Sequence, residues 1–528
     1  MKRFSRSIPK TSIILFAFLC IATTLALADV KLPHVIGSQM VLQGQMPIPI
    51  WGWANPGEQV TVKFANHQAN TAADEKGNWM VKLPAIKAPG PYKMTVIANN
   101  TIELTDILVG EVWLCAGQSN MEMGIGVVAN GKEEIAAANY PQIRLFDVPK
   151  RPSGQTEADV DAEWRICSPN NISSGGWGGF SAVAYFFGRE IHDQLNVPVG
   201  LIDASWGGSY IEPWTPPEGF ALVPKLTRIL NEIEQTNSDY RKVFTRALDE
   251  FEAWIPKVRK SLADDGRITP GLPDYPHHPF TQNEPYAYPW RPTGLYNGMI
   301  HPLIPFAIRG AIWYQGESNL LDGMLYHEKM KALIGGWRKL WNQGDFPFYF
   351  VQLAPFRYEG WPSKDVTPTS LPEIWQAQLI SLSIPNTGMA VTTDITELHD
   401  IHPHNKQDVG KRLALWALAK TYGRTDLVYS GPLYKSMSIQ RTTIRIPFDH
   451  VGTGLTARDG KPLTWFEIAG ADKKFYKAGT EISGNAVLVW NNKVRKPVAV
   501  RFGWHQEAIP NLINKEGLPA SPFRTDNW

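Results

Sequence analysis

Apolar and polar residues alternate in short segments between residues 30 and 105, the pattern of strands that bury one face. Glycine, proline and acidic residues separate these segments and mark turns. The alternation predicts strands at 47–53, 59–64, 79–83 and 92–97. We therefore expect a small N-terminal β-sandwich over residues 29–106.

Longer apolar runs, separated by helical patterns, begin after residue 106. Near-continuous apolar runs predict strands buried on both faces of a parallel sheet, and they lie at 107–116, 143–148, 197–204, 310–314, 346–353 and 388–393. Helical spacing is clearest at 182–195, 323–341, 373–382 and 408–422. This alternation predicts an α/β domain over residues 107–427, with a doubly wound parallel sheet and helices on both faces.

An insertion interrupts this domain at about residues 216–294. Apolar residues at helical spacing around 226–233 and 244–255 predict a pair of helices. Seven prolines between Thr269 and Pro292 exclude regular structure there. Long loops of this kind are usually functional or disordered, and the aromatic residues of this one favour a rim that binds a ligand.

Alternating segments return near residue 428 and continue to the C-terminus. The predicted strands lie at 442–446, 463–468, 486–490 and 498–504. We expect a C-terminal β-region over residues 428–528, packed on the α/β domain.

The first 28 residues have the layout of a signal peptide. Four basic residues precede an apolar stretch, and Ala26-Leu27-Ala28 fits a cleavage site. We therefore expect export to the periplasm or the extracellular space. No other apolar run reaches the length of a membrane span, so no span is expected after cleavage.

Composition and charge narrow the classes of function. The 52 Lys and Arg residues nearly balance 50 Asp and Glu residues, so no basic field is present to attract nucleic acid. Cys115 and Cys167 remain after cleavage and can pair in an exported protein, although nothing in the sequence requires it. Neither cysteine has a neighbour at metal-ligand spacing. The sequence leaves the oligomeric state open.

Polar motifs follow four of the predicted strands, at the edge where open α/β sheets bind ligands. In chain order the motifs are Gly117-Gln118-Ser119-Asn120-Met121, Ser205-Trp206-Gly207-Gly208-Ser209, Gln315-Gly316-Glu317-Ser318-Asn319 and His399-Asp400-Ile401-His402-Pro403-His404. Each motif alone is compatible with a capped turn or a polar loop. Four of them at one sheet edge indicate an enzyme site.

These residue types fit nucleophilic catalysis. A serine at a strand-to-helix turn projects from the sheet edge, where backbone N–H groups can stabilise an oxyanion. Paired glycines let a backbone N–H approach a ligand closely. The three histidines at 399, 402 and 404 can bind a metal or supply one catalytic base. No second ligand cluster accompanies them, which favours the base, so we expect neither a metal nor a cofactor.

At these motifs the sequence resembles the sialate O-acetylesterases and related carbohydrate acetylesterases of the SGNH hydrolase superfamily. The resemblance extends from about Leu32 to the C-terminus, and the order and joint presence of the motifs carry it. Residues 112–116, 295–300, 313–314 and 406–410 belong to the same pattern. The resemblance implies an SGNH-type α/β fold and a carboxylic ester hydrolase that acts on an acetylated carbohydrate.

The resemblance also implies the roles of individual residues. Ser119 would be the nucleophile and His402 the general base. The oxyanion hole would use the Ser119 N–H, an N–H from Gly207 or Gly208, and the Gln315 side chain.

The acid that orients His402 is open, because the position three residues before it, where an aspartate usually stands, is His399. Glu317 is the first candidate, Asp400 the second and Asp394 the third.

The expected function is that of a secreted serine esterase that removes O-acetyl groups from sugars, first of all from 9-O-acetylated sialic acids. Acetyl xylan or another plant polysaccharide is the alternative substrate. A non-catalytic carbohydrate-binding protein and a glycoside hydrolase that uses Glu317 are the rivals from other classes. Asn120, Trp290 and Arg291 are expected to bind the sugar: an arginine suits the carboxylate of a sialate, and a tryptophan suits the face of a neutral sugar.

Overall fold

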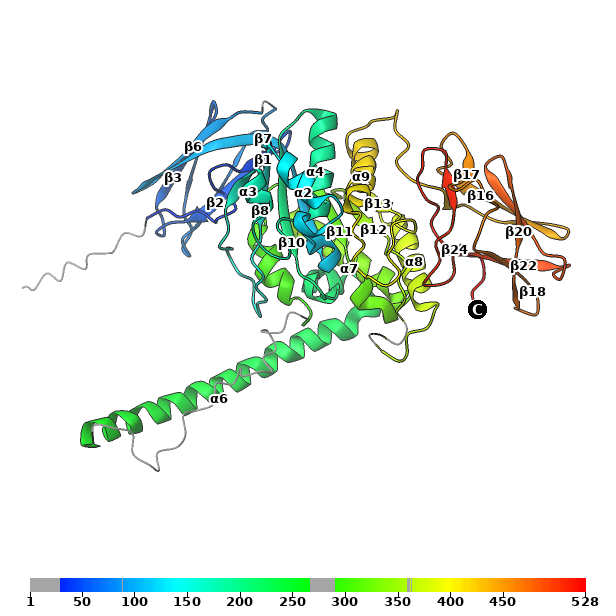
Figure 1. Cartoon of the computed structure of the whole chain (residues 1–528). Coiled ribbons are helices and arrows are strands. Elements are labelled where there is room, and N and C mark those ends of the chain that lie inside the picture. Colours follow the sequence, from blue (N-terminus) through cyan, green and yellow to red (C-terminus); the bar gives the residue numbers. More distant parts are fainter. Residues whose placement is uncertain (1–28, 88, 266–289, 359–360, 362) are drawn as a thin grey trace, which may run out of the picture.

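Three parts follow one another along the chain: a strand-rich N-terminal part, a central α/β part and a strand-rich C-terminal part (Figure 1). The computed structural model describes residues 29–87, 89–265, 290–358, 361 and 363–528. The expected signal peptide at 1–28 and residues 269–289 of the proline-rich stretch lie outside these residues.

The N-terminal part consists mainly of antiparallel strands with one buried face. They are β1 (Val41–Gln43), β2 (Ile48–Trp53), β3 (Gln59–Phe64), β4 (His67–Ala72), β5 (Asn78–Leu83) and β6 (Tyr92–Ile97). β2 pairs with β5, whereas β3 pairs with β4 and β6. The sequence did not predict β4, because this edge strand has no buried residue and therefore no apolar alternation.

The long strand β7 (Thr101–Gly117) links the N-terminal part to the central sheet. Its first half pairs with β6, and its second half pairs with β10 (Val199–Ser205) and β11 (Gly310–Tyr314). The first residues of β7 are mostly exposed or half-buried, whereas every residue from Ile107 to Gly117 is buried. The domain boundary expected after residue 106 falls inside this strand, because the change in pattern reflects a change in burial and not a linker.

The central sheet is parallel except at one edge. Its strands in spatial order are β13 (Thr387–Ala390), β12 (Phe348–Val351), β11, β7, β10, β8 (Tyr140–Asp147) and the antiparallel edge strand β9 (Trp164–Cys167). The expected α/β class is confirmed, although the sheet as a whole is mixed.

Helices cover both faces of the central sheet. The α-helices of the central part are α1 (Ser119–Glu122), α2 (Gly131–Ala137), α3 (Pro169–Ile172), α4 (Ala182–Leu195), α5 (Pro217–Ala221), α6 (Thr227–Asp265), which extends away from the sheet, α7 (Leu325–Trp341), α8 (Ser370–Ile380) and α9 (Lys406–Trp416). Trp113 of β7 packs on Phe187 of α4, whereas Trp313 of β11 packs on Trp337 of α7. Trp313 lies beside Ala116, three residues from Trp113, so the two tryptophans point to opposite faces.

Residues 227–265 form the single helix α6 instead of the expected pair of helices. The polar segment between the two apolar patches contains neither glycine nor proline, so nothing ends the helix there. The first turns of α6 pack on α5, and Ile229 and Ile233 belong to one apolar cluster with Ala332 of α7. The rest of α6 extends away from the central part (Figure 1).

The expected C-terminal strand-rich region is confirmed. It contains β14 (Leu433–Tyr434), β15 (Ser438–Gln440), β16 (Thr443–Asp449), β17 (Leu455–Ala457), β18 (Phe466–Gly470), β19 (Phe475–Lys477), β20 (Gly479–Ser483), β21 (Ala486–Trp490), β22 (Pro497–Phe502), β23 (Leu512–Asn514) and β24 (Phe523–Arg524). These strands enclose a separate apolar core. Several side-chain contacts join the region to the central part. Among them, Gln352 donates to Ser521 at 2.9 Å, Arg524 donates to Gln376 at 3.0 Å, and Arg357 pairs with Glu507 at 2.9 Å.

Two further sequence expectations concern the cysteines and the membrane. Cys115 and Cys167 are both buried and unpaired. No helix among the described residues is long and apolar enough to cross a bilayer.

Candidate functional site

Ser119 opens the short helix α1, directly beyond the end of β7. Gly117, at the turn, has a φ of +147°, and a Cβ there would lie 2.2 Å from the carbonyl oxygen of Tyr314. Only glycine fits this close approach of two neighbouring strands. The turn therefore places Ser119 at the carboxyl edge of the central strand.

Ser119 and His402 are in direct contact, with 2.8 Å between Oγ and Nε2. His402 lies on the loop between β13 and α9, so the two residues come from distant parts of the chain. The contact leaves the imidazole positioned to take the hydroxyl proton.

The surroundings of His402 favour a neutral imidazole. Burial lowers the pKa of His402 from its ordinary 6.5, and the Lys406 charge lowers it further, whereas the Asp400 and Glu122 charges raise it. The Trp177 ring packs edge-to-face on the imidazole at 4.8 Å between centroids. The sequence analysis did not identify Trp177, which belongs to none of the four motifs.

Asp400 is the carboxylate in contact with His402. Its Oδ1 accepts the His402 backbone N–H at 2.8 Å and lies 3.7 Å from Nδ1. The other two candidates have different partners. Glu317 accepts a hydrogen bond from Asn120 at 2.5 Å, and Asp394 forms a bidentate pair with Arg412 at 2.7 and 2.8 Å. Of the three candidates, Asp400 is the one in contact with His402, whereas Glu317, ranked first from the sequence, points to Asn120.

Gln315 does not offer a free donor to an oxyanion. Its side chain is fully buried, and its Nε2 donates to the Ser209 carbonyl at 3.1 Å and to Asn319 Oδ1 at 2.7 Å. The Tyr326 hydroxyl donates to Gln315 Oε1. Gln315, which the sequence analysis expects in the oxyanion hole, donates both amide hydrogens to the surrounding loops in this structure, so its place there stays a prediction.

The glycine pair lies beside the nucleophile. A Cβ on Gly207 would lie 3.2 Å from the Ser119 Cβ, which places this backbone closer to Ser119 than the backbone of Gly208. The Gly207 N–H donates to Glu122 Oε2 at 2.5 Å, and Glu122 also forms an ion pair with Lys150. Glu122 gives no sign of this role in the sequence, because an acidic residue in the first turn of a helix is typical of a helix-stabilising charge.

Asn120 is buried and fully hydrogen-bonded, so it is not placed to bind a sugar. Its Nδ2 donates to Glu317 and to the Ile401 carbonyl, and its Oδ1 accepts from Lys406 Nζ. The expectation that Asn120 binds the substrate is corrected for this reason.

Aromatic side chains lie around the opening of the site. Trp290 contacts the Gly208 position and packs edge-to-face on Tyr210, which is 41% exposed. Arg291 lies farther along, beside Glu232 and Thr236 of α6. These positions make Trp290, Tyr210 and Trp177 the candidates for contact with a substrate.

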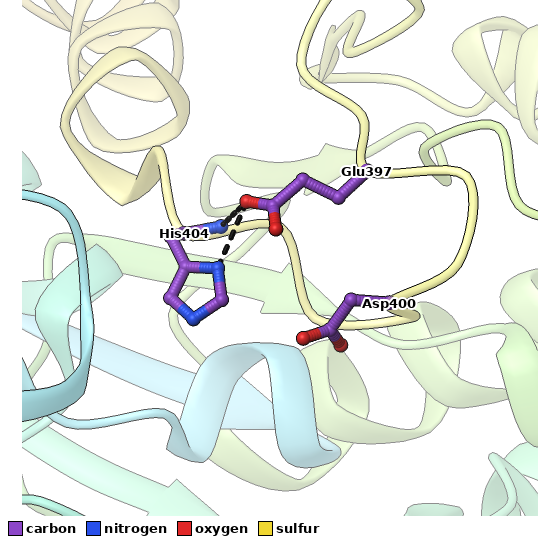
Figure 2. Close-up of side chains that lie close together, drawn as sticks. All are labelled: Glu397, Asp400 and His404. Carbon is purple, nitrogen blue, oxygen red and sulfur yellow. Dashed lines mark hydrogen bonds and ion pairs between the residues drawn. The ribbon is translucent and has the colours of Figure 1, made fainter.

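The three histidines of the fourth motif do not converge on one point. His402 contacts Ser119, His399 is exposed, and His404 pairs with Glu397. Figure 2 shows Glu397, Asp400 and His404 side by side on one loop, with Glu397 Oε1 accepting both the His404 backbone N–H and Nδ1 at 3.1 and 2.8 Å. These contacts brace the loop that carries His402.

A family model and the curated relatives both point to acetylesterases that act on carbohydrates. The family described as "Carbohydrate esterase, sialic acid-specific acetylesterase" matches residues 109–250 and 287–419. The mouse sialate O-acetylesterase is 30% identical over 539 residues, which cover 92% of this chain and 93% of the mouse protein. The human sialate O-acetylesterase is 30% identical over 440 residues, covering 76% of this chain and 73% of the human protein.

One solved structure is similar over nearly the whole chain. It is the crystal structure of a carbohydrate acetylesterase from Xanthomonas citri, with a TM-score of 0.78 and 37% identity. The match covers 95% of this chain and 100% of that one.

Proposed function

Since the chain belongs to the sialic acid-specific acetylesterase family of carbohydrate esterases, which are carboxylic ester hydrolases, we propose that it removes O-acetyl groups from sugars through an acetyl-enzyme on Ser119. The observation that carries this proposal is the 2.8 Å contact between Ser119 Oγ and His402 Nε2 at the carboxyl edge of the sheet. The order of the motifs around it supports an SGNH-type site.

The reaction follows from this contact. His402 Nε2 takes the hydroxyl proton while Ser119 Oγ forms a bond to the acetyl carbon. The tetrahedral intermediate collapses, the bond to the sugar oxygen breaks, and the imidazolium gives its proton to that oxygen. Water, deprotonated by the same nitrogen, then attacks the acetyl carbon. The bond from this carbon to Ser119 Oγ breaks, the imidazolium returns its proton to Oγ, and acetate leaves.

Backbone N–H groups would stabilise the oxyanion. The N–H of Ser119 is at the start of α1 and has no partner within the helix. The Gly207 N–H supplies the second donor once it exchanges the Glu122 carboxylate for the oxyanion, and Lys150 holds Glu122 during that exchange. One such donor typically contributes about 10²–10³ in kcat.

Asp400 would orient His402 and stabilise its charged form. It already accepts the backbone N–H of His402, and a small rotation of either side chain closes the 3.7 Å gap to Nδ1. A positive imidazolium strengthens this attraction at the moment when the proton has moved.

We propose 9-O-acetylated sialic acid as the first substrate, since the curated relatives carry the name sialate O-acetylesterase. A neutral plant polysaccharide such as acetyl xylan is the second candidate. Trp290, Tyr210 and Trp177 favour it, because aromatic rings suit the faces of neutral sugars, while Arg291 lies away from Ser119 beside α6. The signal-like first 28 residues support export.

Acetate release from an O-acetylated sialoglycoconjugate and from acetylated xylan, at equal ester concentration, tests the substrate. A much faster reaction with xylan would exclude the sialate assignment and leave the Ser119 mechanism standing. Absence of release from either substrate, with an intact fold, would favour a binding protein without activity.

A further inference from the structure

The side-chain amide of Asn120 lies between a buried cation and a buried carboxylate. Lys406 Nζ donates to Asn120 Oδ1 at 2.5 Å, and Asn120 Nδ2 donates to Glu317 Oε1 at 2.5 Å. Lys406 has no exposed surface, and Glu317 is 4% exposed. Burying two opposite charges is costly, so their placement on either end of one amide calls for a reason.

The two charges fix the direction of the amide. An ammonium group can only donate and a carboxylate can only accept, so the oxygen of Asn120 must face Lys406 and its nitrogen must face Glu317. In this orientation the second Nδ2 hydrogen reaches the Ile401 carbonyl at 3.0 Å. If the amide were turned over, its nitrogen would face the Lys406 ammonium, and its oxygen would face the Glu317 carboxylate and the Ile401 carbonyl, so no hydrogen bond would remain at these three contacts.

This amide joins the two halves of the catalytic pair. Asn120 follows the nucleophile Ser119, and Ile401 precedes the base His402. The hydrogen bond from Asn120 to the Ile401 carbonyl therefore links the backbone beside Ser119 to the backbone beside His402. An error of about 1 Å in the distance between two such catalytic groups costs roughly 10²-fold in rate.

Aromatic and acidic groups surround Lys406. The Tyr314 ring lies 5.3 Å from Nζ, and the charges of Glu317, Asp400 and Glu397 act on the lysine. Burial opposes both charges, since it lowers the pKa of Lys406 to about 7 and raises the pKa of Glu317, whereas the charge of each residue favours the charged form of the other. Glu317 Oε2 is buried without a hydrogen-bond partner among the described residues, a cost that packing alone does not explain.

We propose that Lys406 and Glu317 are positioning residues that act through Asn120 and hold Ser119 and His402 at contact distance. The inference rests on the esterase function proposed above and extends it. Neither residue touches the reacting atoms. Their effect is expected in kcat, with little change in KM.

The test begins with Lys406→Met, assayed with 4-nitrophenyl acetate. We expect kcat to fall by about 10²-fold with KM within about twofold of wild type. Lys411→Met is the matched control, because Lys411 lies exposed on the same helix, and it should leave both constants unchanged. Wild-type kcat in Lys406→Met would overturn the proposal.

A double variant controls for a loss of activity that is caused by misfolding of Lys406→Met. Glu317→Gln combined with Lys406→Met removes both buried charges beside Asn120, so its melting temperature should stay close to that of wild type. Its kcat should remain low, because the neutral pair no longer fixes the amide of Asn120. A folded double variant with wild-type kcat would overturn the proposal.

A second readout separates this inference from the proposed function. The rate at which an organophosphate reagent modifies Ser119 depends on the contact with His402 and needs no acetyl substrate. Slow modification of Lys406→Met supports the positioning role even if the wild type hydrolyses no acetyl ester. Modification at the wild-type rate refutes that role, whatever the substrate is.

Discussion

Ser119 and His402 can be tested one side chain at a time, because each lies at the edge of the sheet and contributes little to the core. Ser119→Ala and His402→Ala are expected to reduce acetyl-ester hydrolysis to below about a hundredth of the wild-type rate. The exposed His399 serves as the control, and His399→Ala should retain nearly full activity. Equal losses at residues 399, 402 and 404, measured by acetate release, would contradict a single catalytic histidine.

The pH dependence of activity reports the protonation state of the His402 imidazole. The base works in its neutral form, and burial lowers its pKa, so activity should persist below pH 6.5 and fall only as pH drops through the lowered value. Glu122→Gln removes a negative charge that raises this pKa. The acid limb of a kcat/KM profile should therefore move to still lower pH in this variant, and a shift to higher pH would argue against the assignment.

The proposed mechanism uses no metal. Treatment with EDTA is therefore expected to leave kcat unchanged, because Glu397 already binds His404 and Asp400 binds the His402 backbone. Loss of activity that one divalent ion restores would contradict this expectation.

Motifs at strand ends pointed to this edge of the parallel sheet, and the family resemblance singled out Ser119 and His402 within them. The sequence could not give the direction of a side chain, which is why Glu317 was ranked above Asp400. Lys406 was missed as a site residue for a related reason. A lysine at the start of a helix gives no sign in the sequence that it is fully buried.

At the scale of elements, the contact between Asp394 and Arg412 ties the loop after β13 to α9. Arg412 is buried, and it also donates to the Val391 carbonyl at 2.6 Å. Asp394→Asn leaves this charge without its partner, so we expect a loss of about 3–5 kcal/mol in the free energy of unfolding. Urea denaturation measures the loss; an unchanged midpoint with abolished activity would instead make Asp394 a catalytic acid.

Elements with a strong apolar pattern were predicted well, whereas short strands such as β1, β9 and β23 were not predicted, although they are largely buried. The strand at Gly310–Tyr314 and the helix at Ala182–Leu195 have the predicted bounds, because both carry a strong apolar pattern. β4 has no buried residue and left no pattern. The residues between the two apolar patches of α6 are polar and carry no apolar pattern that would show the helix continuing. The two patches therefore predicted two helices, although the chain forms one.

At the scale of the whole molecule, the C-terminal region completes the central part. Gln352, at the end of β12, is fully buried, and its amide donates to Ser521. Removing residues 428–528 would expose this amide and the apolar surface around it. We expect a chain of residues 29–427 to be largely insoluble or to melt well below the full chain, as measured by soluble yield and thermal unfolding. An equal melting temperature would show that the C-terminal region is an independent addition.

The length of β7 has a consequence for the order in which the protein is made. During synthesis, β6 and the first half of β7 are made one after the other and can pair at once. The second half of β7, around residues 112–116, obtains its neighbour β11 only after about 200 further residues have been made. At typical rates of synthesis this delay is roughly 10–40 s. All five of these residues are buried in the finished sheet, so they form an exposed apolar segment on the growing chain. We therefore expect nascent chains that stop before residue 314 to aggregate or to bind chaperones, and longer ones to escape both fates.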